Sequence, residues 1–204
     1  MTLTDRVNAA IRAVPPWCLY VVAPVPAAWW LYLGLTGGLG VEPIKALEHE
    51  LGEFALQLLI LGLAVTPLRQ HLRINLMKHR RAIGVIAFFY VFLHLLAWLL
   101  LDMRGLWSQI LADIVKRPYI TIGMAGFALL IPLALTSNNL SVRKLGPAWR
   151  KLHKLVYPAV LLGGLHYIWL VKGLQFEPLL YMAAIVGLLL LRWVPQRRRA
   201  MARA

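Results

Sequence analysis

Residues 82–101 read AIGVIAFFYVFLHLLAWLLL, a run of twenty positions without Lys, Arg, Asp or Glu. The hydrocarbon core of a bilayer is about 30 Å thick, and about 20 apolar residues cross it as a helix. The whole chain shares this character, since 60% of its 204 residues are hydrophobic and 15% are charged. Soluble domains have about 45–50% apolar and about 25% charged residues. The sequence therefore predicts an all-α integral membrane protein.

Five more apolar segments accompany this one. Long uncharged runs cover residues 13–41, 118–142 and 155–171, and shorter runs cover 54–68 and 178–191. Fifteen helical residues extend only about 22 Å, so the helices of the two shorter runs must begin earlier, near Leu47 and Glu177. We therefore predict one domain over residues 1–204, a bundle of six transmembrane helices with spans near 17–36, 47–67, 81–101, 118–137, 150–171 and 177–194.

The basic residues are distributed unevenly about these spans. The N-terminus, the second and fourth loops and the tail carry 17 Lys and Arg, whereas the opposite side carries five, Lys45, Arg104, Lys116, Arg117 and Lys172. Cytoplasmic segments of membrane proteins are enriched in Lys and Arg, so both termini are predicted to be cytoplasmic. Because the basic residues flank apolar segments and form no patch on a polar domain, the net charge of +14 does not indicate nucleic-acid binding.

Two histidines lie deep inside predicted spans. His94 and His166 follow the basic clusters at the cytoplasmic side by similar numbers of residues, so both lie about 20 Å from that edge. An interhelical hydrogen bond could explain either residue alone. A pair at one depth on two helices is what axial coordination of haem iron requires, within a bundle that can hold a cofactor. Small residues that would leave room for a porphyrin lie nearby, at Gly123, Gly126, Gly163 and Gly164.

A second site is predicted at the cytoplasmic side. His79 and His94 differ by about 60° around a helix and share a face, whereas His153 and His166 differ by about 220°, with Pro158, which can kink a helix, between them. His153 is the stronger candidate ligand of the two. Basic residues there could pair with haem propionates or an anionic flavin phosphate, or could simply mark the cytoplasmic side; they are Arg80, Arg81, Arg143, Arg150 and Lys151.

The remaining polar candidates are less specific. His71 is expected to be solvated, and His49 is expected to make an interfacial hydrogen bond. Glu50 or Glu53, at the entrance of the second span, could accept protons from a quinol. Cys18 is the only cysteine and the chain has no CxxC or CxxCH motif, which argues against iron–sulfur clusters and covalently attached haem.

Three stretches resemble a known family. They are HELGEFALQLLILGLAVTPLR at 49–69, HRRAIGVIAFFYVFLH at 79–94 and RKLHKLVYPAVLLGGLHY at 150–167. They look like the haem-binding membrane subunits of periplasmic protein-methionine-sulfoxide reductase systems, which belong to the ferric-reductase-like transmembrane domains. The resemblance covers about residues 15–195. It implies one or two b-type haems, FMN, and haem-iron ligation by the matching residues His94, His153 and His166.

The same resemblance implies a role in electron transfer at the bacterial inner membrane. Electrons would come from the quinone pool or a cytosolic flavin reductase and would pass to a soluble periplasmic molybdenum-cofactor reductase that repairs oxidised methionines. We expect the partner to perform the final reduction, with no catalytic residue in this chain. The outer loops 37–47 and 102–117 are the natural docking surface. The chain has no GxGxxG fingerprint, so its electrons must come from another protein.

Two other functions fit the residues. One is a di-haem cytochrome b anchor of a different periplasmic oxidoreductase, which would carry electrons in the opposite direction. The other is a small non-redox transporter or scaffold, in which the buried histidines carry protons or merely pack. A transporter is disfavoured because the two halves of the chain show no evident sequence repeat.

Overall fold

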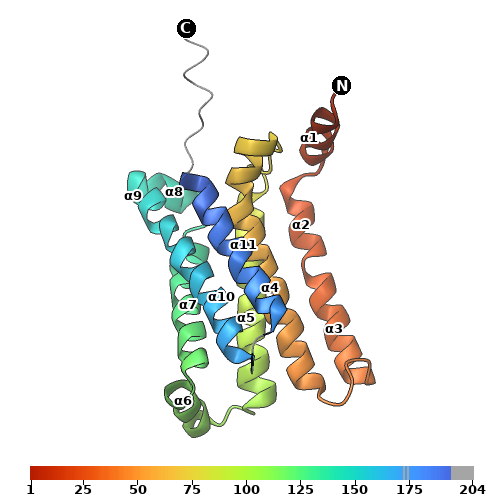
Figure 1. Cartoon of the computed structure of the whole chain (residues 1–204), viewed down its shortest axis with the longest axis vertical. Coiled ribbons are helices and arrows are strands. Elements are labelled where there is room, and N and C mark those ends of the chain that lie inside the picture. The colour runs from red at the N-terminus through yellow and green to blue at the C-terminus, as the bar shows by residue number, and fades with distance from the viewer. Residues whose placement is uncertain (172, 174, 194–204) are drawn as a thin grey trace.

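The computed structural model describes residues 1–171, 173 and 175–193, and every regular element within them is helical. The long helices stand side by side and alternate in direction (Figure 1). Helix α1 and the last turn of α11 lie at one end of this bundle, which we call the α1 end, and α6 lies at the other, the α6 end. The elements are α1 (Leu3–Ala13), α2 (Pro16–Val22), α3 (Pro24–Thr36), α4 (Pro43–Pro67), η1 (Leu68–Leu72), α5 (Arg80–Ala97), η2 (Trp98–Asp102), α6 (Trp107–Lys116), α7 (Pro118–Leu135), α8 (Asn139–Leu145), α9 (Pro147–Leu152), η3 (His153–Leu155), α10 (Val156–Leu170) and α11 (Phe176–Trp193).

The predicted all-α membrane architecture is confirmed at the level of helices that can cross a bilayer. Four helical segments of the described chain are long and apolar enough to do so: Pro16–Thr36, Pro43–Leu72, Arg80–Asp102 and Pro118–Leu135. Helices α10 and α11, which correspond to the fifth and sixth predicted spans, stand beside them in the bundle. Residue 194, Lys172 and the basic residues of the tail beyond 193 lie outside the described residues.

Proline accounts for several helix boundaries that the sequence analysis placed differently. Pro43 begins α4 four residues before the predicted start of the second span, so His49 and Glu50 lie within the helix. Pro24 begins α3 and separates it from α2, which divides the first span in two. The fifth predicted span begins at 150, and its first six residues lie in α9 and η3, which lead directly into α10 at Val156. Pro158 lies in its first turn, where a missing N–H costs no hydrogen bond, so this proline marks the start of the helix.

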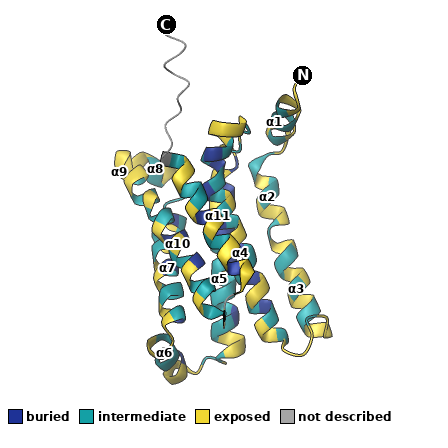
Figure 2. Ribbon diagram, in the orientation of Figure 1, coloured by how far each residue is buried: buried dark blue, intermediate teal, exposed yellow. Residues whose placement is uncertain are grey.

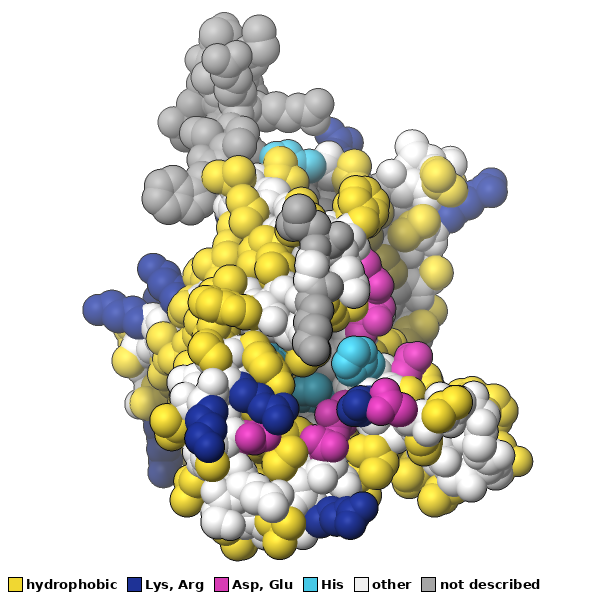
Figure 3. All heavy atoms as spheres, turned by 60° about the horizontal axis from the view of Figure 1, so that its bottom comes forward, with side chains coloured by type: hydrophobic (Ala, Val, Ile, Leu, Met, Phe, Trp, Pro, Cys, Tyr) yellow, Lys and Arg dark blue, Asp and Glu magenta, His cyan; other side chains and the backbone are white. Residues whose placement is uncertain are grey.

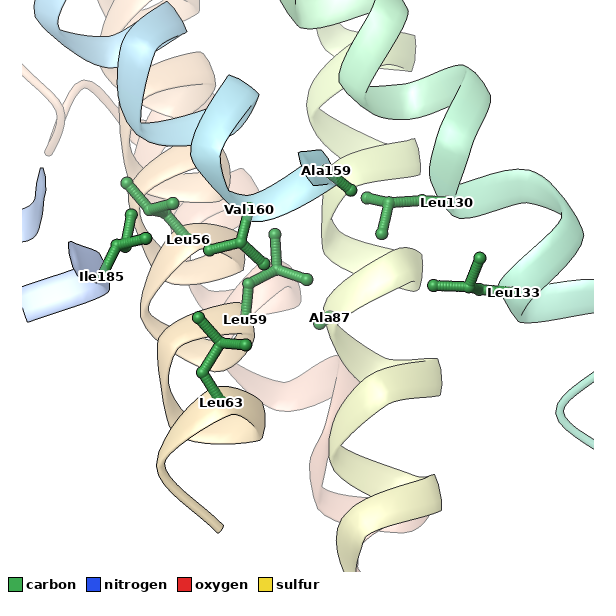
Figure 4. Close-up of a cluster of buried hydrophobic side chains, with 9 residues drawn as sticks. All are labelled: Leu56, Leu59, Leu63, Ala87, Leu130, Leu133, Ala159, Val160 and Ile185. Carbon is green, nitrogen blue, oxygen red and sulfur yellow. The ribbon is translucent and has the colours of Figure 1, made fainter. Parts of the chain in front are cut away.

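Two clusters of buried apolar side chains hold the bundle together. The larger cluster, shown in Figure 4, joins α4, α5, α7, α10 and α11. The smaller one joins α4 and α5 and packs against residues of α2 and α3. Figure 2 shows the buried residues gathered on the inner helices and exposed ones along the outer faces. The larger cluster comprises Leu56, Leu59, Leu63, Ala87, Leu130, Leu133, Ala159, Val160 and Ile185.

Polar side chains also join the helices. Arg192 of α11 donates from Nη1 to the Tyr157 hydroxyl, 2.8 Å away, and from Nη2 to the Leu63 carbonyl, 2.6 Å away. The hydroxyl of Tyr90, a side chain with no exposed surface, donates to the Ala23 carbonyl at 2.6 Å. These bonds connect α11 to α10 and α4, and α5 to the break between α2 and α3. Arg192 was predicted only as part of the basic tail, and the structure uses it between helices.

Candidate functional site

A cavity of about 280 Å³ lies between α4, α5, α7 and α10, towards the α6 end of the bundle. Its walls are mainly apolar, and glycines contribute to three of them, at Gly52, Gly123, Gly126 and Gly163. Figure 3 looks onto the α6 end, where histidine side chains lie in a hollow among acidic and basic ones. The cavity therefore combines an apolar interior with a charged mouth.

The structure brings His94 and His166 together across this cavity. Their ring centres lie 6.2 Å apart, with the ring planes at 77°. Nδ1 of His94 lies 2.9 Å from the carbonyl oxygen of Glu48 on α4, and Nδ1 of His166 lies 2.7 Å from the carbonyl oxygen of Tyr119 on α7. Each ring is thus fixed by the backbone of a neighbouring helix.

These bonds determine which nitrogen of each ring is available to a ligand. A carbonyl oxygen can only accept a hydrogen bond, so Nδ1 of His94 and of His166 must carry the proton and donate it. In the neutral imidazole the other nitrogen, Nε2, then holds a lone pair. Metal-binding histidines are held in the same way, with the second nitrogen donating to a carbonyl or carboxylate. In this arrangement the Nε2 atoms of His94 and His166 are the nitrogens that could accept a ligand.

A polar cluster between α4 and α11 reaches the same cavity through Glu53. The hydroxyl of Tyr181 donates to Oε1 of Glu53 at 2.8 Å, and Nε2 of Gln57 lies 2.9 Å from the same oxygen and 2.7 Å from the hydroxyl. Glu53 and Tyr167 both line the cavity. Of the two glutamates considered as proton acceptors, Glu53 therefore reaches the cavity, and Glu50 is exposed.

The mouth of the cavity carries charged groups of both signs, from Lys45, Glu48, Asp102 and Arg117, together with His49. Arg117 donates to the Tyr119 hydroxyl at 3.2 Å and pairs with Asp113 at 3.5 Å. The hydrogen bond to Tyr119 raises the pKa of Arg117 above its ordinary value. The guanidinium thus remains a fixed positive charge beside the entrance.

The other two predicted histidine ligands point to different elements. His79 is buried, and its Nε2 donates to the Val14 carbonyl, 2.9 Å away, so it ties the N-terminal segment to the start of α5. Nε2 of His153 lies 3.0 Å from the hydroxyl of Thr136. That hydroxyl donates to the Pro132 carbonyl, so it accepts from His153. Neither ring presents a free Nε2 in this arrangement.

The predicted basic residues lie near the α1 end. Arg80 and Arg81 begin α5, and Arg81 donates to the Asn139 side chain of α8 at 2.7 Å. Arg150 is exposed in the last turn of α9. His71 is exposed in η1. These cations are thus separated along the bundle from the cavity that holds the histidine pair.

Sequence reasoning missed several residues of the site. Glu48 and Tyr119 could not be identified, because they act through backbone carbonyls, which every residue has. Tyr181 and Gln57 were not considered. Gly52 was also missed, whereas Gly123 was named as a small residue near the histidine pair. Among the described residues no group of three or more His, Cys, Asp or Glu could hold a metal ion.

Comparison with known proteins gives a consistent picture. Residues 51–164 match a family described as "Ferric reductase like transmembrane component". A protein of Agrobacterium fabrum named "Protein-methionine-sulfoxide reductase heme-binding subunit MsrQ" is 50% identical over 173 residues, which cover 85% of this chain and 80% of the relative. A protein of the same name from Brucella ovis is 51% identical over 176 residues, covering 86% and 80%. No solved structure matches the chain.

Proposed function

This chain belongs to the ferric-reductase-like transmembrane family and, within it, to the haem-binding subunits of protein-methionine-sulfoxide reductase, and we propose that it carries electrons through the membrane to such a reductase. The observation that carries this proposal is the histidine pair. His94 and His166 face each other with both Nδ1 atoms bound to carbonyls. Reduction of the oxidised methionine belongs to the partner, and this chain supplies the path of the electrons.

The spacing of the two rings fits haem iron. An imidazole nitrogen binds a transition metal at about 2.0 Å, and it lies about 1.1 Å from the centre of a ring whose bonds are about 1.33 Å long. Two imidazoles on opposite sides of one iron therefore have centres about 6.2 Å apart, and the rings of His94 and His166 are 6.2 Å apart. Haem would supply the four remaining donors and a centre that exchanges single electrons.

We propose that this haem is of the b type, because the chain has no CxxCH motif for covalent attachment. A second haem near His153 would require that ring to release Thr136, so one haem per chain is the stoichiometry that the observed contacts favour. The cations Arg80, Arg81 and Arg150 near the α1 end would suit propionates of that second haem or the phosphate of FMN. The case for FMN rests on the family resemblance alone.

The proposed orientation places the α1 end in the bacterial cytoplasm, with six spans and both termini cytoplasmic. The unequal distribution of Lys and Arg supports it. The cavity then opens to the periplasm, where a soluble molybdenum-cofactor reductase could approach the loops at 37–47 and 102–117. Electrons would come from the quinone pool or a cytosolic flavin reductase. If a quinol is the donor, its protons need an acceptor, and Glu53 lies on the cavity wall.

Difference spectroscopy tests the proposal. The chain is purified in detergent, and reduced-minus-oxidised absorbance and haem per chain are measured for wild type, His94→Ala, His166→Ala and His153→Ala. We expect a b-type spectrum in wild type, its loss or sharp reduction in the first two variants, and its retention in the third. His71→Ala, at an exposed position of η1, is the control. A colourless wild-type protein, expressed with ample haem, would overturn the proposal.

The electron path is tested with the partner reductase. Haem reduced in the purified chain should reoxidise when the partner and methionine sulfoxide are both added, and it should stay reduced when either is left out. Reoxidation that needs neither would contradict delivery to the reductase.

A further inference from the structure

Two glycines stand opposite the paired imidazoles, and we propose that Gly52 and Gly123 are positioning residues for them. Each leaves the space through which a histidine of the neighbouring helix reaches the backbone carbonyl four residues earlier. The inference rests on the proposed function, since it concerns the two histidines proposed to bind iron. To the proposed haem site it adds Gly52 and Gly123, and it explains why Nδ1 of each ring carries the proton.

The contacts at these glycines are closer than a side chain would allow. A methyl group at Gly52 would lie 3.0 Å from Nδ1 and 3.1 Å from Cε1 of His94. A methyl group at Gly123 would lie 2.8 Å from Nδ1 and 3.1 Å from Cε1 of His166. Carbon atoms in proteins pack at about 3.5–4.0 Å. A methyl group at Gly123 would therefore require the ring of His166 to shift, and one at Gly52 would require the ring of His94 to give by a few tenths of an ångström.

Helix geometry explains why the glycine lies four residues after the carbonyl. The carbonyl of residue i accepts from the N–H of residue i+4, and the Cα–Cβ bond tilts towards the N-terminus of the helix. A side chain at position i+4 therefore covers the carbonyl at position i. Glu48 and Gly52 on α4, and Tyr119 and Gly123 on α7, have this spacing. Without a Cβ, the second lone pair of each carbonyl is open to the imidazole.

The arrangement occurs twice, in two pairs of antiparallel helices. In α4 and α5 it comprises Glu48, Gly52 and His94, and in α7 and α10 it comprises Tyr119, Gly123 and His166. The two glycines precede their histidines by 42 and 43 residues. An accidental contact would not be expected to recur with the same atoms and with the same four-residue spacing of carbonyl and glycine, which indicates that this spacing serves the two rings.

Other glycines of the described chain lack this relationship. Methyl groups at Gly126 and Gly163, which also line the cavity, would make contacts of 3.5 and 3.4 Å, close to ordinary packing. On α4, a methyl group at Gly62 would come no closer than 3.9 Å to a neighbour, and at Gly84 on α5 it would meet nothing within 4 Å. Gly62, which is on the same helix as Gly52, and Gly84, which is on the helix of His94, therefore provide controls for a change of glycine to alanine.

The consequence for the metal site is a fixed direction for each Nε2. A hydrogen bond from Nδ1 to a carbonyl sets the tautomer and ring orientation and makes the metal-binding nitrogen more basic. Loss of such a partner typically weakens metal affinity by about 10- to 100-fold. We expect a larger effect from Gly123→Ala than from Gly52→Ala, because the methyl group would lie nearer to the ring at Gly123.

The tautomers are measured by nitrogen-15 NMR of the full chain labelled at histidine and depleted of haem, because iron bound at Nε2 would leave the proton on Nδ1 whatever that nitrogen contacts. The two signals are assigned with His94→Gln and His166→Gln. Wild type should show protonated Nδ1 at both positions. Gly123→Ala should lose that signal for His166 alone, and Gly52→Ala for His94 alone, whereas Gly62→Ala and Gly84→Ala should retain both.

A second readout uses the oxidised protein. The low-spin electron paramagnetic resonance signal should shift in Gly52→Ala and Gly123→Ala, with haem affinity reduced about 10- to 100-fold, and both should match wild type in the two controls.

The outcomes separate this inference from the proposed function. Protonated Nε2 in the wild-type rings would overturn the inference without any variant, even if an alanine variant failed to fold. Unchanged tautomer signals and an unchanged resonance signal in both cavity variants would also overturn it. A wild-type protein that binds no haem would overturn the proposed function, and the NMR measurement on the same protein would still decide the role of the two glycines.

Discussion

The ring centres of His94 and His166 lie 6.2 Å apart, although the two residues are 72 positions apart in the chain. Neither ring depends on the other for its orientation, because each donates to a carbonyl of a different helix, at Glu48 and at Tyr119. The orientation of each proposed ligand is therefore set by the protein backbone. If the two rings bind haem iron as proposed, backbone anchors of this kind would limit their rearrangement during electron transfer.

Removal of haem should lower the thermal stability of the chain. A ligand that binds only the folded state stabilises it by about 2.7 kcal/mol at a concentration 100-fold above its Kd. Melting of haem-replete and haem-depleted protein in detergent, followed by tryptophan fluorescence, should show a higher Tm for the replete sample. In His94→Ala the supply of haem should make no such difference. Equal melting of the two wild-type samples would contradict a cofactor that bridges the bundle.

Tyr181→Phe should slow reduction by a quinol and leave the haem content unchanged. The substitution removes the hydroxyl that donates to Glu53 and contacts Gln57. If Glu53 accepts a proton from the donor, Glu53→Gln should slow the same step further, within the range of about 10²- to 10⁴-fold typical of general acid–base catalysis. Stopped-flow reduction by a soluble quinol analogue measures both rates.

Two controls accompany this prediction. Reduction by dithionite requires no proton acceptor and should be the same in all variants. Glu50→Gln, at an exposed position of the same helix, should behave as wild type. Equal sensitivity of the Glu50 and Glu53 variants would remove the special role of Glu53.

Arg192→Leu should destabilise the bundle by about 1–3 kcal/mol, since it leaves the Leu63 carbonyl and the Tyr157 hydroxyl without their donor. The absorbance of the bound haem should not change, because Arg192 does not line the cavity. Denaturant unfolding in mild detergent measures the loss. Arg143→Leu, at an exposed position of α8, removes the same charge and should have little effect. A similar loss in both variants would assign the effect to net charge.

Tyr90→Phe should cost about 1 kcal/mol of stability. The ring would keep its edge-to-face contact with Phe54, whose centre is 4.6 Å away, and would lose only the hydroxyl that donates to Ala23. Tyr32→Phe, at an exposed position of α3, is the matched control. Thermal unfolding of the two variants should separate them, and no difference would show that the Ala23 carbonyl finds another donor.

Long apolar segments and paired intramembrane histidines were predictable from the sequence because their signals are local. Hydropathy over about 20 residues identifies a helix that can span a bilayer, and the depth of His94 and His166 follows from counting residues. The fifth span was predicted to begin at 150, within the basic segment that precedes the uncharged run at 155–171, whereas α10 begins at Val156. Only the position of Pro158 in the first turn of that helix distinguishes a helix start from a kink.

His79 illustrates what counting along a helix cannot give. The helical spacing predicted that His79 lies on the same face as His94, but it could not predict the partner of the ring. In the structure Nε2 of His79 donates to the Val14 carbonyl. That contact joins residues 65 positions apart. No pattern within the segment around His79 could reveal it, because the partner is a backbone carbonyl. Gly52 was missed for a related reason, since its function lies in the absence of a side chain.

The site has one further consequence, for the assembly of the protein in the membrane. Each histidine has its carbonyl and its glycine on one neighbouring antiparallel helix. One such set lies in α4 and α5, and the other lies in α7 and α10. Each pair of helices can thus insert and dock with its own imidazole already oriented, as independent units of membrane folding do. In that order of assembly, haem would bind last and would join the two pairs of helices.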